Sequence, residues 1–279
     1  MMLHKFKRLA LLRESKYAAH TYRSFDAAAA IYCRIERSCS SNGCQIAELV
    51  ENGVLEIGTG RIATAPHVFV ALGATKVATF DVERQFDRKQ TNLALQNSKI
   101  AHRLLEGLSY GISHEDVVNN INSFSSGNLL DSGKIAYYAP ISNDEAESLG
   151  EFSFHYSYTV LEHVQEDILP AFFKSVKKTL STNGVSVHYV DHINHAGGVR
   201  NPFGHLTHAT SMPKASENSC AVKLSTIVEV ALAQGLKLKF SDVQCFKKNW
   251  HSMIQNDQIR EEFRNNDGIT TAILGFEHA

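Results

Sequence analysis

Short apolar runs that end in glycine or an acid recur along this chain and predict an α/β fold. Residues 54–60 form an apolar run that leads into two glycines spaced by one residue. A second apolar run, at residues 77–80, ends at Asp81. A buried strand, a glycine-rich turn opening a helix, and a second strand tipped by an acid together make half of a nucleoside-binding α/β unit.

Later apolar segments extend the same pattern. Five further strands are predicted at residues 135–139, 152–156, 185–190, 236–240 and 270–276. The strands in the middle of the chain are strongly apolar, which is typical of parallel strands covered on both faces. Periodicity alone therefore gives the α/β class and leaves the number of strands in the sheet open.

Helices are predicted between these strands. One covers residues 65–72 with Pro66 in its first turn, and another covers residues 170–180 with Asn183 and Gly184 as its C-cap. The alanine-rich residues 3 to about 37 predict one or two amphipathic helices, followed by a loop at residues 38–43. We expect residues 1–50 to form a helical cover and residues 51–279 to form the main domain.

Residues 84–133 are too long for one simple connection between strands. Residues 90–108 predict a helix with Leu93, Ile100, Leu104 and Leu105 on one side, and residues 113–124 predict a second. We interpret the segment as a helical insertion over the active site. A pair of helices with a purely structural role is the alternative.

Composition excludes several classes of function. The net charge is −1 and the pI about 6.9, so there is no basic field for nucleic-acid phosphates. No apolar run approaches the length of a membrane span. The five cysteines form no C-x-x-C pair, which favours a reduced, cytoplasmic setting. The expected partner is a small molecule, with neither nucleic acid nor membrane, and the oligomeric state is open.

Two nucleoside cofactors fit the glycine turn. Residues 58–63 match the dinucleotide fingerprint, which makes NAD a candidate and an NAD-dependent oxidoreductase one possible function. Glu56, two residues before the first glycine, favours a different ligand. A carboxylate there would repel a pyrophosphate, whereas it suits a ligand with a positive amino group and no phosphate.

Two motifs resemble those of class I S-adenosylmethionine-dependent methyltransferases. Glu56, Gly58 and Gly60 match the family's E-x-G-x-G-x-G, although Ile62 replaces the third glycine. About a hundred residues later, residues 152–164 read FSFHYSYTVLEHV and resemble F-D-x-V-x-S-x-x-V-L-E-H-V, with Ser153 in place of the acid. The resemblance implies a Rossmann-like, seven-stranded, mostly parallel sheet and S-adenosyl-L-methionine as cofactor.

The resemblance also implies where the cofactor binds. The contacts come from the ends of the first four strands, at Glu56, Ile57, Gly58, Thr59, Gly60, Asp81, Val82, Ile141, Ser157 and Tyr158. Asp81 is the expected ligand of the ribose hydroxyls, with Glu83 as the alternative. Adenine is expected to bind backbone groups around Ile141 and Ser142, because no acid follows the third strand until Asp144.

Histidines supply the catalytic candidates. His188, Asp191, His192, His195, His205 and His208 lie within about twenty residues. Their spacing does not define a metal site, so we expect none, and a histidine acting as general base on a hydroxyl acceptor is preferred. His192, just past the fifth strand, is the first candidate, and His163 and His195 follow. His188 could simply be packed within its strand.

The acceptor has no readable motif. Methyl transfer asks mainly that a nucleophile be held in line with the activated methyl group, so a sharp catalytic signature is not required. The chain lacks the Asn-Pro-Pro-Tyr motif of many N-methyltransferases. A small organic acceptor is therefore expected, with O-methylation slightly favoured. Because Ile62 and Ser153 depart from the motifs, a non-catalytic binding protein with the same fold is a further alternative.

Overall fold

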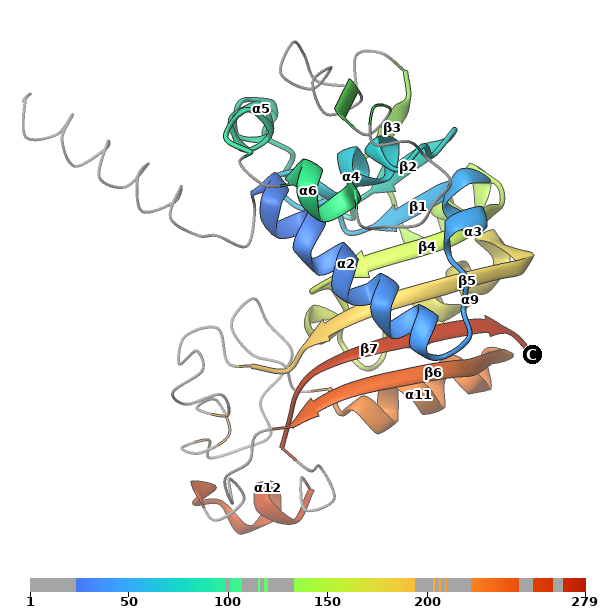
Figure 1. Ribbon diagram of the computed structural model, residues 1–279. Helices are drawn as coiled ribbons and strands as arrows, with labels where there is room; N and C mark the ends of the chain where they lie inside the picture. The colour runs from blue at the N-terminus through green and yellow to red at the C-terminus, as the bar shows by residue number, and fades with distance from the viewer. Residues whose placement is uncertain are drawn as a thin grey trace, which may run out of the picture.

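A seven-stranded mixed sheet forms the centre of the molecule (Figure 1). The structure is a computed structural model, which describes residues 24–98, 101–106, 115, 118–119, 133–193, 203, 206, 209, 222–245, 253–262 and 268–279. Its strand order is β3-β2-β1-β4-β5-β7-β6. The strands are β1 (Val54–Ile57), β2 (Val77–Phe80), β3 (Ile135–Tyr138), β4 (Phe152–Tyr158), β5 (Leu180–Asp191), β6 (Leu236–Cys245) and β7 (Ile269–His278).

Strands β1 to β5 pair in parallel, and β7 lies antiparallel between β5 and β6. This confirms the predicted seven-stranded, mostly parallel sheet. All four residues of β1 and of β2 are buried, as expected for parallel strands covered on both faces. The carboxyl ends of the parallel strands therefore meet at one edge of the sheet, called the carboxyl edge below.

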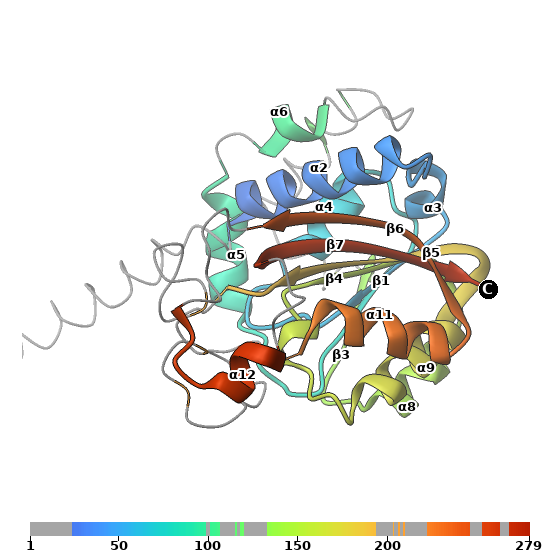
Figure 2. The ribbon, with the colours of Figure 1, turned by 90° about the horizontal axis from the view of Figure 1, so that it is seen from below.

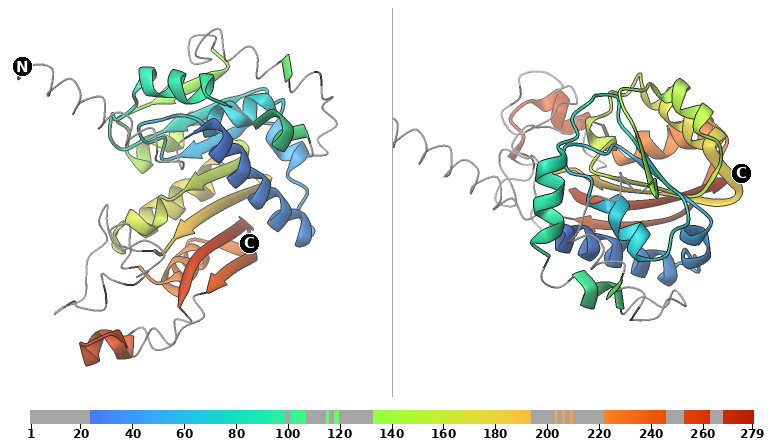
Figure 3. Two further views of the ribbon diagram at one scale, coloured as in Figure 1. Left: turned by 60° about the vertical axis from the view of Figure 1, so that its left-hand side comes forward. Right: turned by 90° about the horizontal axis from the view of Figure 1, so that it is seen from above.

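Helices cover both faces of the sheet (Figure 2). Helices α2, α3 and α4 lie on one face, and α8, α9 and α11 on the other. Helix α5 stands at the carboxyl edge (Figure 3). The helices are α2 (Phe25–Ser41), α3 (Ala47–Glu51), α4 (Ala65–Ala71), α5 (Arg88–Gln96), α6 (Ala101–Glu106), α8 (Asn143–Ala146), α9 (Leu169–Thr179), α11 (Leu224–Ala233) and α12 (Asp257–Glu262), with 3-10 helices η3 (Glu147–Leu149) and η4 (Leu161–His163).

Each face of the sheet has its own aromatic core. On the α2 face, the Phe69 ring contacts Tyr32, Phe154 and Tyr156 edge-on, with ring centroids 5.1–5.8 Å apart. On the α9 face, Phe173 packs against Phe172 and Phe276. Burying aromatic side chains of this size contributes about 1.5–3 kcal/mol each. The two layers fix the sheet between its helices and thereby hold the carboxyl edge in place.

Helix α2 ends later than the sequence predicts. The Ser24 hydroxyl accepts a hydrogen bond from the Ala27 amide and starts the helix, which continues to Ser41. The predicted loop at residues 38–43 is therefore wrong for its first four residues, because Ser38 and Cys39 are buried and extend the helical face. The expected helical segment at residues 3–23 lies outside the described residues.

The helix predicted over residues 90–108 is interrupted. Helix α5 begins after Asp87, whose carboxylate accepts from the Gln90 amide, and ends at Gln96. Helix α6 begins at Ala101 and packs on α2. Leu93 is 51% exposed, so it does not share the buried side with Leu105. Of the second predicted helix, at residues 113–124, only 115, 118 and 119 are described.

Asn183 and Gly184 do not cap α9. The helix ends at Thr179, and both residues lie inside β5. The β4–β5 pairing shifts register between Phe152 and Phe154, and this irregularity takes up the extra residues. A Cβ at Gly184 would lie 2.9 Å from the Ser153 carbonyl oxygen, so the glycine permits a close approach of the strands rather than a helix end.

Strands β4, β5, β6 and β7 are longer than predicted, and β3 is one residue shorter. Cys33, Cys39, Cys44 and Cys245 are free thiols. In the part of the chain that the structure describes, no helix combines the length and the apolar character needed to cross a membrane.

Candidate active site

The glycine turn after β1 has a backbone that only glycine tolerates well. Gly58 and Gly60 have φ values of 85° and 62°. The amides of Gly58 and Thr59 both donate to the Phe80 carbonyl, at 2.9 and 3.2 Å. A Cβ on Gly58 would lie 2.4 Å from a methyl group of Val160, whereas one on Gly60 would meet no atom within 4 Å. The turn is thus closed on the Val160 side and open at Gly60.

Asp81 joins the second strand to this turn. One of its carboxylate oxygens accepts from the Gly60 amide at 2.8 Å, and the other accepts from the Glu83 amide at 3.1 Å. The structure thereby brings together the two halves that the sequence separates by about twenty residues. A carboxylate oxygen has two lone pairs, so each still has capacity for a ligand hydroxyl.

Glu56 lies buried beneath the turn. In the register of the sheet it stands between Thr79 on β2 and Tyr156 on β4. The Thr79 hydroxyl donates to the Glu56 carboxyl at 2.5 Å and lies 2.5 Å from the Thr59 hydroxyl. Burial raises the pKa of Glu56 to about 8; the Thr79 hydrogen bond opposes this rise and the charge of Asp81 adds to it.

Thr79 was not among the residues predicted for the site. Its role depends on the β1–β2 register, which places it opposite Glu56. A pattern search along one strand cannot reveal a partner on the next.

Helix α5 packs against the outer side of the glycine turn. The Ala63 amide donates to the Thr91 hydroxyl at 3.2 Å, and the Asp87 amide donates to the Arg61 carbonyl at 2.8 Å. The first helix of the segment at residues 84–133 therefore lies beside the candidate cofactor site. Whether the whole segment shapes the substrate pocket stays a prediction.

The region predicted for adenine lies beside the ends of β2 and β3. The Ile141 amide already donates to the Asp81 carbonyl at 3.1 Å, and the Ser142 amide donates to the Glu145 carboxylate at 2.7 Å. These two backbone donors are thus occupied within the protein. The side chain of Val82, which is 60% exposed, and that of Ile141 remain available as apolar contacts.

Ser157 and Tyr158 point to opposite faces of the sheet, as successive strand residues do. The Ser157 hydroxyl is buried and bonds His188 Nδ1 at 2.7 Å. The structure therefore does not bring this side chain to the cofactor site. Tyr158 lies on the α2 face, with its ring centroid 4.9 Å from that of Tyr189.

His188 is a core residue. Ser157 and Ser186 bond its two ring nitrogens at 2.7 and 2.8 Å, and Phe172, Phe173 and Phe276 surround the ring. Burial lowers its pKa to about 3, so the ring is neutral at physiological pH. Within the described residues, no three His, Cys, Asp or Glu side chains gather in a way that could hold a metal ion. His195, His205 and His208 lie outside those residues.

His192 and His163 lie near the carboxyl edge. His192 directly follows β5, its amide donates to the Thr270 carbonyl at 2.8 Å, and its side chain is buried. His163 ends η4 and is half-buried. Beside it, burial raises the pKa of Glu162 well above its usual range, and the charge of Asp191 acts in the same direction. Glu162 thus places a buried carboxyl next to His163 in the chain, which the sequence did not predict.

The strand order, with β7 antiparallel between β5 and β6, defines the Rossmann-like fold of class I S-adenosylmethionine-dependent methyltransferases. No protein-family model matches the sequence. No curated protein matches it either.

Several solved methyltransferase structures are similar to this chain at low sequence identity. An S-adenosylmethionine-dependent methyltransferase from Clostridium acetobutylicum is 11% identical, with 98% of this chain and 99% of that chain covered and a TM-score of 0.49. Magnesium protoporphyrin IX methyltransferase from Synechocystis, solved with bound SAH, is 10% identical, with 89% of this chain and 84% of that chain covered and a TM-score of 0.47. A TehB-like methyltransferase from Corynebacterium glutamicum is 13% identical over 90% and 98%, with a TM-score of 0.42.

Proposed function

We propose that this protein is a methyltransferase that binds S-adenosyl-L-methionine at the carboxyl edge of β1 and β2 and methylates a small organic acceptor. The observation that carries the proposal is the buried carboxyl of Glu56 beneath the turn at residues 58–60. A cationic ligand would stabilise the ionised form of this group, whereas a pyrophosphate would be repelled by it.

Three parts of the site divide the cofactor between them. Glu56 and the turn, including Ile57 and Thr59, would face the amino-acid portion. Asp81 would take the ribose hydroxyls, because each of its oxygens retains a lone pair beyond the bonds to Gly60 and Glu83. The side chains of Val82 and Ile141 would flank the adenine, and Tyr158 would lie near the methyl group.

The reaction needs little chemistry from the protein. The sulfonium of the cofactor supplies an activated methyl group, and the protein positions the acceptor in line with it. We favour an oxygen acceptor, with His192 taking the proton because a histidine titrates near neutrality. His163 and His195 are the alternative bases. Removing the base should lower kcat about 100-fold or more, as is usual for general-base catalysis.

Isothermal titration of the full chain with S-adenosylhomocysteine, with NADH in parallel, tests the proposal. We expect S-adenosylhomocysteine to bind and NADH not to bind. Asp81→Ala should weaken the binding at least about tenfold, the equivalent of one charged hydrogen bond. Glu83→Ala is the matched control, since Glu83 contributes its amide to Asp81 and, among the described residues, its carboxylate accepts a hydrogen bond from Gln85.

Binding of NADH alone would contradict the proposal and support the oxidoreductase that residues 58–63 allow. Binding of S-adenosylhomocysteine without turnover on any acceptor would support the binding-protein alternative. Equal affinity of Asp81→Ala and the wild type would refute the ribose assignment.

A further inference from the structure

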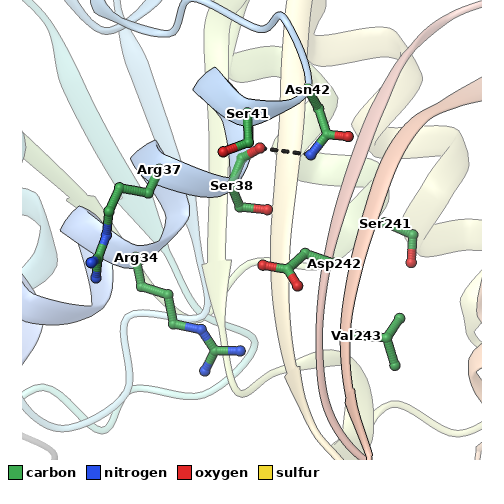
Figure 4. A pocket seen from close by; sticks show the side chains of 8 residues that line it. All are labelled: Arg34, Arg37, Ser38, Ser41, Asn42, Ser241, Asp242 and Val243. Atoms are coloured by element: carbon green, nitrogen blue, oxygen red, sulfur yellow. Dashed lines mark hydrogen bonds between the residues drawn. The ribbon is translucent and has the colours of Figure 1, made fainter.

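A polar groove runs between α2 and β6 on the α2 face of the sheet (Figure 4). Its volume is about 540 Å³, and among the described residues that line it Val243 is the only apolar one. Because β6 is the outermost strand, this part of the sheet lies at one side of the molecule, below α2 in Figure 1. A groove of this size can hold a small molecule.

Two arginines on α2 give one wall of the groove a fixed positive charge. The Arg34 guanidinium donates to the Tyr189 hydroxyl at 3.1 Å and to the Thr271 hydroxyl at 3.3 Å, and lies 5.2 Å from the Tyr189 ring centroid. Arg37 donates through Nε to the Cys33 carbonyl at 3.2 Å, so its terminal nitrogens remain available. Neither arginine forms an ion pair with a carboxylate among the described residues.

The opposite wall carries a negative charge, and a hydroxyl lies between the two. The Asp242 carboxylate on β6 makes no hydrogen bond or ion pair with any residue in the described part of the chain. Ser38 on α2 is only 6% exposed, and its hydroxyl has no hydrogen-bond partner among those residues. Figure 4 shows both side chains directed at the space between α2 and β6. Leaving a buried hydroxyl unpaired is unfavourable, so a bound polar molecule would relieve it.

The groove adjoins the carboxyl edge at its Arg34 end. Asp242, Ile273 and Tyr189 lie side by side in the sheet, two residues before the end of β5. Thr271, which Arg34 contacts, pairs with Asp191, the last residue of β5. The Tyr189 ring in turn packs on Tyr158 at the end of β4. A molecule seated in the groove can therefore extend toward the proposed methyl-transfer site.

We propose that this groove binds the charged end of the methyl acceptor, and that the acceptor is a small zwitterion of the amino-acid type. This assignment rests on the proposed methyltransferase function. The acceptor's carboxylate faces Arg34 and Arg37, its ammonium group faces Asp242, and the Ser38 hydroxyl bonds to one of them. A ligand with only a negative charge would be repelled by the Asp242 carboxylate. A ligand with only a positive charge would leave the positive charges of the two arginines without a partner.

The twenty common L-amino acids are the probes, each titrated into the full chain saturated with S-adenosylhomocysteine and followed by saturation-transfer NMR. For the amino acid that binds most tightly, the N-acetyl derivative and the methyl ester are titrated in the same way. We expect each derivative to bind at least about tenfold more weakly, because each removes one of the two charges.

Three variants localise the binding. Asp242→Asn and Arg37→Gln should each weaken the zwitterion at least about tenfold while leaving S-adenosylhomocysteine binding unchanged. Glu229→Gln, a matched change on α11 at the other face of the sheet, should alter neither. Thermal unfolding of each variant establishes that it is folded.

The outcomes separate the two proposals. If S-adenosylhomocysteine binds and no amino acid does, or if the N-acetyl derivative binds equally well, the zwitterion assignment is overturned and the methyltransferase proposal stands. Equal binding by Asp242→Asn and the wild type also overturns it. If S-adenosylhomocysteine does not bind the wild type, the methyltransferase proposal fails and the acceptor role of the groove fails with it.

Discussion

Glu56 on β1 and His188 on β5 are both buried ionisable residues of the same sheet, yet their surroundings differ. Hydroxyls occupy both ring nitrogens of His188, and three aromatic rings enclose it. Glu56 receives one side-chain hydrogen bond, from Thr79, and lies under a glycine turn. Burial lowers the pKa of His188 to about 3 and raises that of Glu56 to about 8. A buried group with all its bonds made serves the fold, whereas one with capacity left beside an open turn can serve a ligand.

The largest effect on stability is expected from His188→Ala. The substitution leaves a cavity among the aromatic rings and removes the partner of the Ser157 and Ser186 hydroxyls. We expect the free energy of unfolding to fall by about 3 kcal/mol. Urea denaturation measures this change. The affinity of the folded variant for S-adenosylhomocysteine should be unchanged. A variant that kept its stability and lost the ligand would contradict the assignment of His188 to the fold and not to ligand binding.

Gly58→Ala should produce the largest effect on the ligand. The new methyl group meets Val160, and alanine is strained at the φ of 85°. We expect S-adenosylhomocysteine affinity to fall about 100-fold, or roughly 2.7 kcal/mol. Titration calorimetry measures the loss, and Val160→Ala in the same chain should restore part of it by removing the contact. No restoration at all would show that the contact with Val160 is unimportant.

Acid should destabilise the protein through its buried histidines. His188 and His155 have pKa values lowered to about 3 and about 4, so they stay neutral in the fold while the unfolded chain takes up protons below pH 6.5. Their contribution to the free energy of unfolding is complete above pH 6.5 and is lost as the pH falls toward these two pKa values. Between pH 7 and 5.5 we expect a loss of about 1 kcal/mol per histidine.

Urea denaturation at the two pH values gives the difference for the wild type and for His188→Gln. The variant should show a smaller loss between pH 7 and 5.5, since one of the two histidines no longer titrates. An identical loss in both proteins would mean that His188 is not the group responsible.

The sequence was informative where chemistry is local. The glycine turn, Glu56 and Asp81 could be predicted because strand, turn and acid follow one another at fixed spacing. The residues that contact Glu56 and Gly58 from other strands and loops could not be predicted in this way. Thr79 contacts Glu56 only through strand register, and Val160 reaches Gly58 from a segment about a hundred residues away.

The direction in which strand side chains point also could not be predicted from the sequence. Strands β4 and β5 are buried on both faces, so alternation gives no sign of which residues face the cofactor. Ser157 matched the motif yet faces His188, while Tyr158 lies on the α2 face. The groove could not be predicted from the sequence for a different reason, because α2 and β6 lie about two hundred residues apart in the chain.

Proton release on binding tests most directly the claim that Glu56 recognises a cationic ligand. S-adenosylhomocysteine is titrated at pH 7 in two buffers that differ in ionisation enthalpy, into the wild type and into Glu56→Gln. Because the free Glu56 carboxyl is mostly protonated below a pKa of about 8 and a nearby ammonium favours its ionised form, the wild type should release about one proton and the variant none. Equal proton release by both proteins, or none by the wild type, would contradict the account.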